Sequence, residues 1–168
     1  MQRRQMPVPQ LVLAVRSEHA LVLVYERGLG DTVRDLIEAL TDEQRRARLL
    51  SALAVYLAGM HNVGVYHGDL NINNILAQDL AGQWQFTLID NEQNQILPVS
   101  LSSRALANFA RMWAHAQAFP LSAREQELLF SSWFSALKTR HSVATLQQRL
   151  QRRLHKANKR NQQKRGAL

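Results

Sequence analysis

Three polar residues between positions 65 and 76 have the spacing of a phosphoryl-transfer loop. The segment reads VYHGDLNINNIL, and His67, Asp69 and Asn74 form the pattern H-x-D-x-x-x-x-N within it. In that chemistry an aspartate accepts the proton of the attacking hydroxyl, an asparagine five residues later binds a metal ion, and an aspartate after the next hairpin binds Mg²⁺. Asp90 follows the segment FTLI, where the second aspartate is expected. The pattern predicts Asp69 as the catalytic carboxylate and Asn74 and Asp90 as metal ligands.

The other residues of this segment have simpler interpretations. We expect His67 to support the loop by hydrogen bonds, and Gly68 to let the backbone pass close to a neighbouring segment. Asn71 and Asn73 are expected to shape the loop rather than to bind a ligand. Asp and Asn favour turns in any protein, so only the joint spacing with Asp90 favours a phosphoryl-transfer site over ordinary turn chemistry.

A long helix before the loop and a hairpin after it are expected to hold these residues in place. TDEQ at residues 41–44 has the form of a capping box. The helix that follows should end near Gly64 and has one apolar face, which comprises Leu49, Leu50, Leu53, Leu57 and Met60. After the loop, residues 75–77 and 85–89 are expected to form two short strands around a turn at residues 79–82.

The chain is expected to open with a hairpin. Residues 11–16 and 20–26 are rich in Val and Leu and should pair as strands across a short turn at residues 17–19. Asp31 should then cap a short helix that runs to about Leu40.

Helices are expected to fill the last third of the chain. Apolar residues at helical spacing predict one helix around residues 106–113, and SARE at residues 122–125 is a capping box for a second. A last helix should begin near Ser142 and carry on one side Val143, Leu146, Leu150 and Leu154. Residues 157–168 lack an apolar face and are expected to form a disordered basic tail.

Composition and charge narrow the classes of function. The 168 residues carry 21 Lys and Arg and 13 Asp and Glu, and the last acidic residue is Glu127. The absence of cysteine excludes disulfides and thiolate catalysis, and we expect a cytoplasmic protein. No apolar run is long enough to span a bilayer. A solvated helix face is the simplest interpretation of the basic tail, and a contact with the anionic inner membrane is the sharper hypothesis. No interleaving of aromatic and basic residues favours nucleic acid as a partner.

HGDLNINNIL followed by FTLIDNE resembles the protein-kinase-like superfamily, and most of all its lipopolysaccharide core sugar kinases, the Kdo and heptose kinase group. The resemblance implies an α+β, mainly α fold, in which a kinase-like carboxy-terminal lobe retains a β-hairpin of the amino lobe. Residues 1–28 would supply the strands and hinge, and residues 29–156 the helical lobe. It also implies ATP and Mg²⁺ as cofactors, a sugar hydroxyl of lipopolysaccharide core as acceptor, and Glu26, Arg27 and Gly28 as the hinge beside adenine.

Some features depart from that pattern. Where many kinases read D-F-G, this sequence reads Asp90, Asn91, Glu92, which argues against a protein substrate. No lysine precedes Lys138 and only 25 residues precede Glu26, so the glycine-rich loop, the strand lysine and its partner glutamate have no place, and the chain is expected to be amino-terminally truncated.

Three alternatives therefore stay open. The first is a noncatalytic pseudokinase or a truncated remnant of an enzyme. The second is another small-molecule kinase, related to the aminoglycoside or choline kinases, or an atypical kinase of the type that ends in a basic tail. The third is a nucleic-acid-binding module, in which the tail would act and the loop would be incidental.

Overall fold

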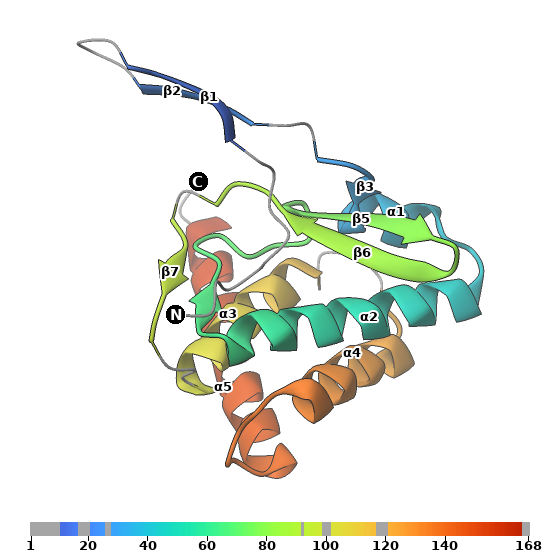
Figure 1. Ribbon diagram of the computed structural model, residues 1–168. Coiled ribbons are helices and arrows are strands. Elements are labelled where there is room, and N and C mark those ends of the chain that lie inside the picture. The colour runs from blue at the N-terminus through green and yellow to red at the C-terminus, as the bar shows by residue number, and fades with distance from the viewer. Residues whose placement is uncertain are drawn as a thin grey trace.

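Five helices and three small sheets make up the part of the chain that the structure describes (Figure 1). The computed structural model describes residues 11–16, 21–25, 28–91, 93–98, 102–116 and 121–165. Side chains are described for residues 28–91, 93–98, 102–113 and 121–155.

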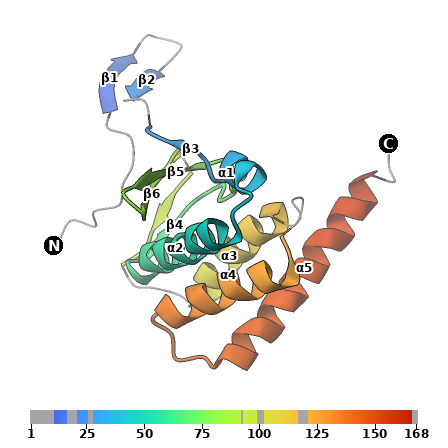
Figure 2. The same ribbon diagram turned by 90° about the vertical axis from the view of Figure 1, so that its right-hand side faces the viewer.

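The opening hairpin is confirmed. Strands β1 (Leu11–Arg16) and β2 (Leu21–Tyr25) pair antiparallel in a sheet of their own. Figures 1 and 2 show this hairpin standing apart from the helices. The predicted turn at residues 17–19 lies outside the described residues.

The first short helix begins one residue later than predicted. Asp31 belongs to strand β3 (Asp31–Thr32) and pairs with Ala77, so it is extended and does not cap the helix. Thr32 caps α1 (Val33–Ala39) instead, and its Oγ1 accepts the backbone N–H of Asp35 at 3.1 Å. The prediction of an Asp31 cap was therefore wrong, because the strand pairing places Thr32 at the boundary.

The long helix α2 (Glu43–Asn62) forms as predicted, with a different cap. Asp42 caps it rather than Thr41, because the Asp42 carboxylate accepts the N–H groups of Gln44 at 2.8 Å and Arg45 at 3.1 Å. A negative charge is favoured at a helix N-terminus, which explains the choice between two adjacent capping residues. The predicted apolar face is buried in the core.

The hairpin after the loop is longer than predicted. Strands β5 (Ile75–Leu80) and β6 (Gln83–Leu88) pair directly, and β3 joins the far side of β5. A turn of only two residues connects them, with φ of 53° at Ala81 and 87° at Gly82, the left-handed pair that suits a tight hairpin. The short strands β4 (Val65–Tyr66) and β7 (Gln95–Ile96) also pair, and two residues are too few to give a periodicity in sequence.

Helices α3 (Ser102–Ala116), α4 (Ala123–Ala136) and α5 (Val143–Arg165) complete the body. The capping box at Ser122 and Glu125 is confirmed. Helix α2 packs against α4, and α3 against α5, so the buried faces of all four helices meet in one core. In its centre the rings of Phe109 and Trp133 stack with their centroids 4.3 Å apart.

The last helix begins at Val143, next to the predicted start at Ser142, and differs from the prediction at its end. It continues to Arg165, past the end predicted near Lys156, because Lys, Arg and Gln favour helix and no glycine interrupts residues 143–165. Val143, predicted on the apolar side, is 41% exposed. No helix in the described part of the chain has the length and apolarity to cross a membrane.

Candidate active site

The loop between β4 and β5 brings Asp69 and Asn74 into direct contact. The Asn74 side-chain nitrogen lies 3.0 Å from the Asp69 carbonyl oxygen and 3.3 Å from its Oδ2. Because both of those atoms are acceptors, the amide nitrogen of Asn74 must face Asp69 and its Oδ1 faces away. No hydrogen bond to that Oδ1 occurs among the described residues, so this oxygen can accept another ligand.

Asn71 shapes the loop from inside, as predicted. Its Nδ2 donates to Asp69 Oδ2 at 3.1 Å, and its Oδ1 accepts the backbone N–H groups of Asn73 at 2.8 Å and Asn74 at 3.2 Å. Asn71 is 6% exposed, whereas Asp69 lies at the surface. The asparagines therefore hold the Asp69 carboxylate from one side and leave its other side open to solvent.

Asp90 stands next to these residues at the end of β6. The backbone N–H of Ile89 donates to the Asn74 carbonyl oxygen at 3.1 Å, one step beyond the paired residues Ile75 and Leu88. Asp90 itself has a φ of 58°, a left-handed conformation that is uncommon for residues other than glycine. Such strain often marks a functional position, and here it occurs at the predicted metal ligand.

His67 joins the loop to the end of β6. Its Nδ1 accepts the backbone N–H of Asp69 at 3.2 Å, so the ring proton is on Nε2, which donates to the Ile89 carbonyl oxygen at 2.9 Å. The side chain is 1% exposed. His67 therefore connects the backbone of Asp69 to Ile89, the residue directly before Asp90.

A buried network from three helices holds His67, and the sequence interpretation missed it. Asn108 of α3 accepts the His67 backbone N–H at 3.2 Å and donates to its carbonyl oxygen at 2.7 Å. His61 of α2 lies 3.2 Å from Asn108 Oδ1, and Trp133 of α4 donates to His61 Nδ1 at 3.1 Å. Since Nδ1 accepts, Nε2 of His61 donates to Asn108. The signal in sequence is a polar residue on an apolar helix face, at Asn108 and at His61.

Burial determines the charge of His61. Loss of solvent lowers its pKa to about 4, against a smaller opposing effect of its hydrogen bond with Asn108. The imidazole is therefore neutral at physiological pH, as the tautomer required by its two hydrogen bonds demands.

Gly68 and the turn after Asp90 fix the other side of the loop. A Cβ atom on Gly68 would lie 2.2 Å from Cβ of Gln93, so only glycine fits this approach, as predicted. Asn94 Oδ1 accepts the Gly68 N–H at 3.1 Å, and Arg111 of α3 donates to the Gly68 carbonyl oxygen. Sequence reasoning missed both Asn94 and Arg111, since neither has local spacing to the loop.

The predicted hinge lies partly within the described residues. Glu26 and Arg27 fall outside them. Gly28 lies so close to β5 and β6 that a Cβ atom there would be 2.3 Å from Leu76 Cδ1 and 3.8 Å from Ile89 Cγ2. The end of the hinge thus approaches the apolar side chains that follow Asn74 and precede Asp90.

The predicted metal ligands, the side-chain oxygens of Asn74 and Asp90, fit Mg²⁺ better than a transition-metal ion. Among the described residues no three His, Cys, Asp or Glu side chains gather in one place. The oxygens of Asn74 and Asp90 are hard ligands, and a magnesium ion in a nucleotide site takes only one or two protein carboxylates together with phosphate oxygens and water. Neither Asp69 nor Asp90 forms an ion pair within the described part, so none of the cations described there competes for them.

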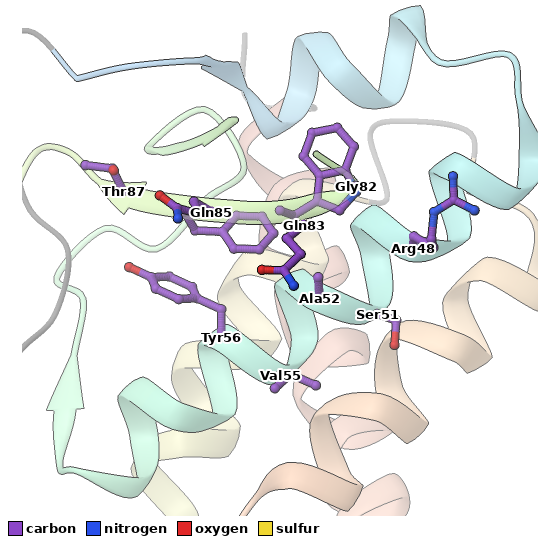
Figure 3. Close-up of a pocket in the computed structure, with 11 residues that line it drawn as sticks. Arg48, Ser51, Ala52, Val55, Tyr56, Gly82, Gln83, Gln85 and Thr87 are labelled. Carbon is purple, nitrogen blue, oxygen red and sulfur yellow. The ribbon is translucent and has the colours of Figure 1, made fainter. Parts of the chain in front are cut away.

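A separate groove lies between α2 and β6, away from the loop (Figure 3). Its volume is about 870 Å³, and the aromatic residues Tyr56, Trp84 and Phe86 contribute to its wall. None of the predicted site residues lines it. The predicted site residues lie outside this groove, and Asp69 and Asp90 are exposed.

Comparison with known proteins agrees with this geometry. A solved structure titled "WaaP in complex with acyl carrier protein" is similar, with a TM-score of 0.67, 17% identity, and coverage of 91% of this chain and 70% of that chain. At this identity the likeness shows the fold alone, and it confirms the mixed, mainly helical kinase-like fold. No curated protein has a matching sequence. A model of the lipopolysaccharide kinase (Kdo/WaaP) family matches residues 1–132, and the chain therefore belongs to that family.

Proposed function

We propose that this protein transfers the γ-phosphate of ATP to a sugar hydroxyl of lipopolysaccharide core. The proposal is carried by the contact of the Asn74 side chain with Asp69 and by the position of Asp90. Asp90 directly follows Ile89, whose backbone N–H donates to the Asn74 carbonyl oxygen. Membership of the lipopolysaccharide kinase family supports ATP as the donor and lipopolysaccharide as the acceptor.

Asp69 would act as the catalytic carboxylate. Its Oδ2 accepts from the side chains of Asn71 and Asn74, at 3.1 and 3.3 Å, which fixes the plane of the carboxylate. Oδ1 would accept the proton of the acceptor hydroxyl as the hydroxyl oxygen attacks the γ-phosphorus, and ADP would leave. His67 would hold Asp69 and Asp90 in fixed relative positions, because it bonds to the backbone N–H of Asp69 and to the carbonyl oxygen of Ile89.

The nucleotide would lie between the hinge and the ends of β5 and β6. Asn74 Oδ1 and the Asp90 carboxylate would hold Mg²⁺, which neutralises charge on the phosphate oxygens. Backbone groups of Glu26, Arg27 and Gly28 would contact adenine, with Leu76 forming an apolar surface beside Gly28.

Phosphate transfer from ATP to purified lipopolysaccharide precursor tests the proposal. We expect transfer that requires Mg²⁺, together with nucleotide binding that Asp90→Asn weakens by about tenfold or more, the loss expected for one charged ligand. Asp79→Asn is the control, since Asp79 pairs with Arg45 at the far turn of the hairpin. Absence of both transfer and nucleotide binding at millimolar ATP would refute the proposal.

A noncatalytic pseudokinase is the second candidate. The observation that favours it is that the described strands β1 to β7 contain no lysine, whereas kinases use a strand lysine to hold the nucleotide phosphates. The two candidates predict different results in the same experiment. A pseudokinase would give no transfer, and Asp69→Asn would leave every measurable property except stability unchanged.

Helix α5 would hold the protein at the anionic inner membrane. It buries Leu146, Leu150 and Leu154 against the body, while Arg152 and Arg153 are exposed. Figure 2 shows its carboxy-terminal half extending past the other helices. Such a basic element near an anionic surface contributes about 1 kcal/mol per Lys or Arg.

Vesicle binding tests this membrane contact. Neutralising Arg149, Arg152, Arg153 and Lys156 to Gln should lower partitioning onto phosphatidylglycerol vesicles by up to about 10³-fold and leave binding to neutral vesicles unchanged. The matched control neutralises four other arginines, which are exposed on other helices: Arg34, Arg45, Arg48 and Arg124. Equal partitioning of the α5 variant and the wild type would contradict the contact.

A further inference from the structure

Two arginines of α3 form hydrogen bonds with segments next to Asp69. The Arg111 guanidinium donates to the carbonyl oxygen of Gly68, the residue directly before Asp69. The Arg104 guanidinium donates to the side chain of Gln95 in β7, the strand that pairs with β4 just before the loop. Seven residues make nearly two helical turns, so Arg104 and Arg111 lie on the same face of α3.

The charges of these two arginines are not neutralised within the described chain. Ion pairs there involve Arg34, Arg45 and Arg46, and α3 carries no acidic residue. Arg104 and Arg111 are both exposed, and their recorded partners are an uncharged carbonyl and an uncharged amide. A guanidinium has five N–H donors, so each retains donors for another ligand.

A purely structural role does not account for a cation at position 111. The Gly68 N–H already donates to Asn94, and two hydrogen bonds between the Asn108 side chain and the His67 backbone hold the loop in place. A neutral donor would serve to hold the Gly68 carbonyl. Other exposed arginines, such as Arg48 and Arg124, form no hydrogen bond with the described residues of the loop, whereas Arg111 bonds to the residue directly before Asp69.

We propose that Arg111, with Arg104 on the same helix face, forms an anion-binding subsite for the acceptor sugar. The subsite would bind an anionic oxygen group, carboxylate or phosphate, on the sugar whose hydroxyl faces Asp69. The planar fork of arginine suits two oxygens of such a group. This inference rests on the proposed function and assigns to that site the acidic class of sugar.

Direct binding of an acidic sugar, measured without ATP, tests the subsite independently of phosphate transfer. The probes are Kdo, its carboxyl methyl ester, and glucose 6-phosphate, in which a neutral sugar carries a phosphate, each titrated into the full chain by calorimetry. Wild type should bind Kdo about 10- to 100-fold more tightly than the ester, the range expected for a charge-assisted bidentate contact. Tighter binding of the sugar phosphate than of Kdo would assign the subsite to phosphate instead of carboxylate.

Variants complete a double-mutant cycle between protein and ligand. Arg111→Gln should weaken Kdo binding by about the same 10- to 100-fold and leave ester binding within twofold, because the carboxylate then has no partner. Arg111→Lys, which keeps the charge and loses the fork, should give an intermediate affinity. Arg124→Gln is the control and should bind Kdo like the wild type.

The outcomes separate this inference from the proposed function. Equal affinity of the wild type for Kdo, its ester and the sugar phosphate would overturn the subsite, as would an equal loss of all three in Arg111→Gln. If transfer to lipopolysaccharide precursor occurs in the wild type and Arg111→Gln lowers kcat with KM unchanged, Arg111 only positions the loop, and the inference fails while the function stands. Discrimination by Arg111 with neither transfer nor nucleotide binding at millimolar ATP would support the subsite and refute the function.

Discussion

The Asn108 side chain holds the backbone of His67 at both of its polar groups. Its Oδ1 lies 3.2 Å from the His67 nitrogen and its Nδ2 lies 2.7 Å from the His67 carbonyl oxygen. Through these two hydrogen bonds, α3 holds the loop at a point two residues before Asp69. Every proposed catalytic role of the loop depends on that anchor.

Replacing Asn108 should therefore impair both stability and transfer. Asn108→Leu leaves the two His67 groups and His61 Nε2 buried without partners, so we expect a loss of about 3 to 5 kcal/mol in the free energy of unfolding. The rate of transfer should fall by about 10-fold or more at a temperature where the variant is folded. Urea unfolding and steady-state kinetics measure the two effects.

Asn62→Leu is the matched control for that change. Asn62 also bonds two backbone groups, donating to the Ala136 carbonyl oxygen at 2.8 Å and accepting from the Lys138 nitrogen at 2.7 Å, but it joins α2 to the end of α4. Its loss should lower stability and leave kcat within twofold. If the two variants lose stability and kcat in the same proportion, Asn108 has no special role in positioning the loop.

The contrast between what was predicted and what was missed follows from sequence separation. His67, Asp69, Asn74 and the helix face of α2 were predictable, since their spacing within one loop or helix reports their local geometry. Asn108 was not, because its partners His61 and His67 are 47 and 41 residues away, and nothing local specifies which helix will lie there. A lone asparagine on the apolar face of α3 was the available sign.

Other differences between the predicted and the observed helix boundaries were of one or two residues. Thr32 and Asp42 cap their helices in place of their neighbours Asp31 and Thr41, because both members of each pair are good caps and the strand pairing or the helix dipole decides. The predicted end of α5 came too early in the chain for another reason. An apolar stripe shows where a helix packs, and the helix can continue beyond that point on propensity alone.

Protonation of His61 should make stability depend on pH. Burial lowers its pKa to about 4, while in the unfolded chain it titrates near its ordinary value of 6.5. As the pH falls from 6.5 toward 4, the unfolded state binds a proton that the folded state excludes. The free energy of unfolding should therefore fall by about 3 kcal/mol over this window. Above pH 6.5 this contribution of His61 to stability should be complete.

Urea unfolding between pH 7.5 and 4.5 measures this dependence. His61→Gln should be less stable than wild type at pH 7.5, because its contacts with Asn108 and Trp133 change, but its stability should vary less between pH 6.5 and 4.5. Parallel curves for the two proteins would show that His61 does not titrate on unfolding.

Gly68 and Gly59 should respond oppositely to alanine. At Gly68 the new Cβ would lie 2.2 Å from Gln93 Cβ and 2.5 Å from its carbonyl oxygen, so the loop must move, and we expect a loss of about 1 to 3 kcal/mol and at least a tenfold fall in transfer. At Gly59, in α2, nothing lies within 4 Å of the new atom. Alanine there should stabilise the helix by about 0.5 to 1 kcal/mol. Thermal melting and kinetics of both variants test this, and equal behaviour would contradict the close approach at Gly68.

Removing the Tyr56 hydroxyl should not destabilise the protein. This hydroxyl is buried without a hydrogen-bond partner among the described residues, and burial raises its pKa. Its ring packs on Phe86 with centroids 5.2 Å apart, a contact that phenylalanine keeps. Tyr56→Phe should raise the free energy of unfolding by about 1 kcal/mol, since an unpaired buried polar group is lost. A fall of 1 kcal/mol or more in urea unfolding would reveal a partner for the hydroxyl.

The role of Asp69 is tested most directly by single-turnover transfer of the γ-phosphate from ATP to lipopolysaccharide precursor. Asp69→Asn keeps the size of the side chain but cannot accept the proton, so the rate should fall by about 10²- to 10⁴-fold while Mg²⁺-ATP still binds. Asp79→Asn, the same change at the far turn of the hairpin, should transfer at the wild-type rate. A wild-type rate in Asp69→Asn would contradict the assignment of this loop as the site of phosphate transfer.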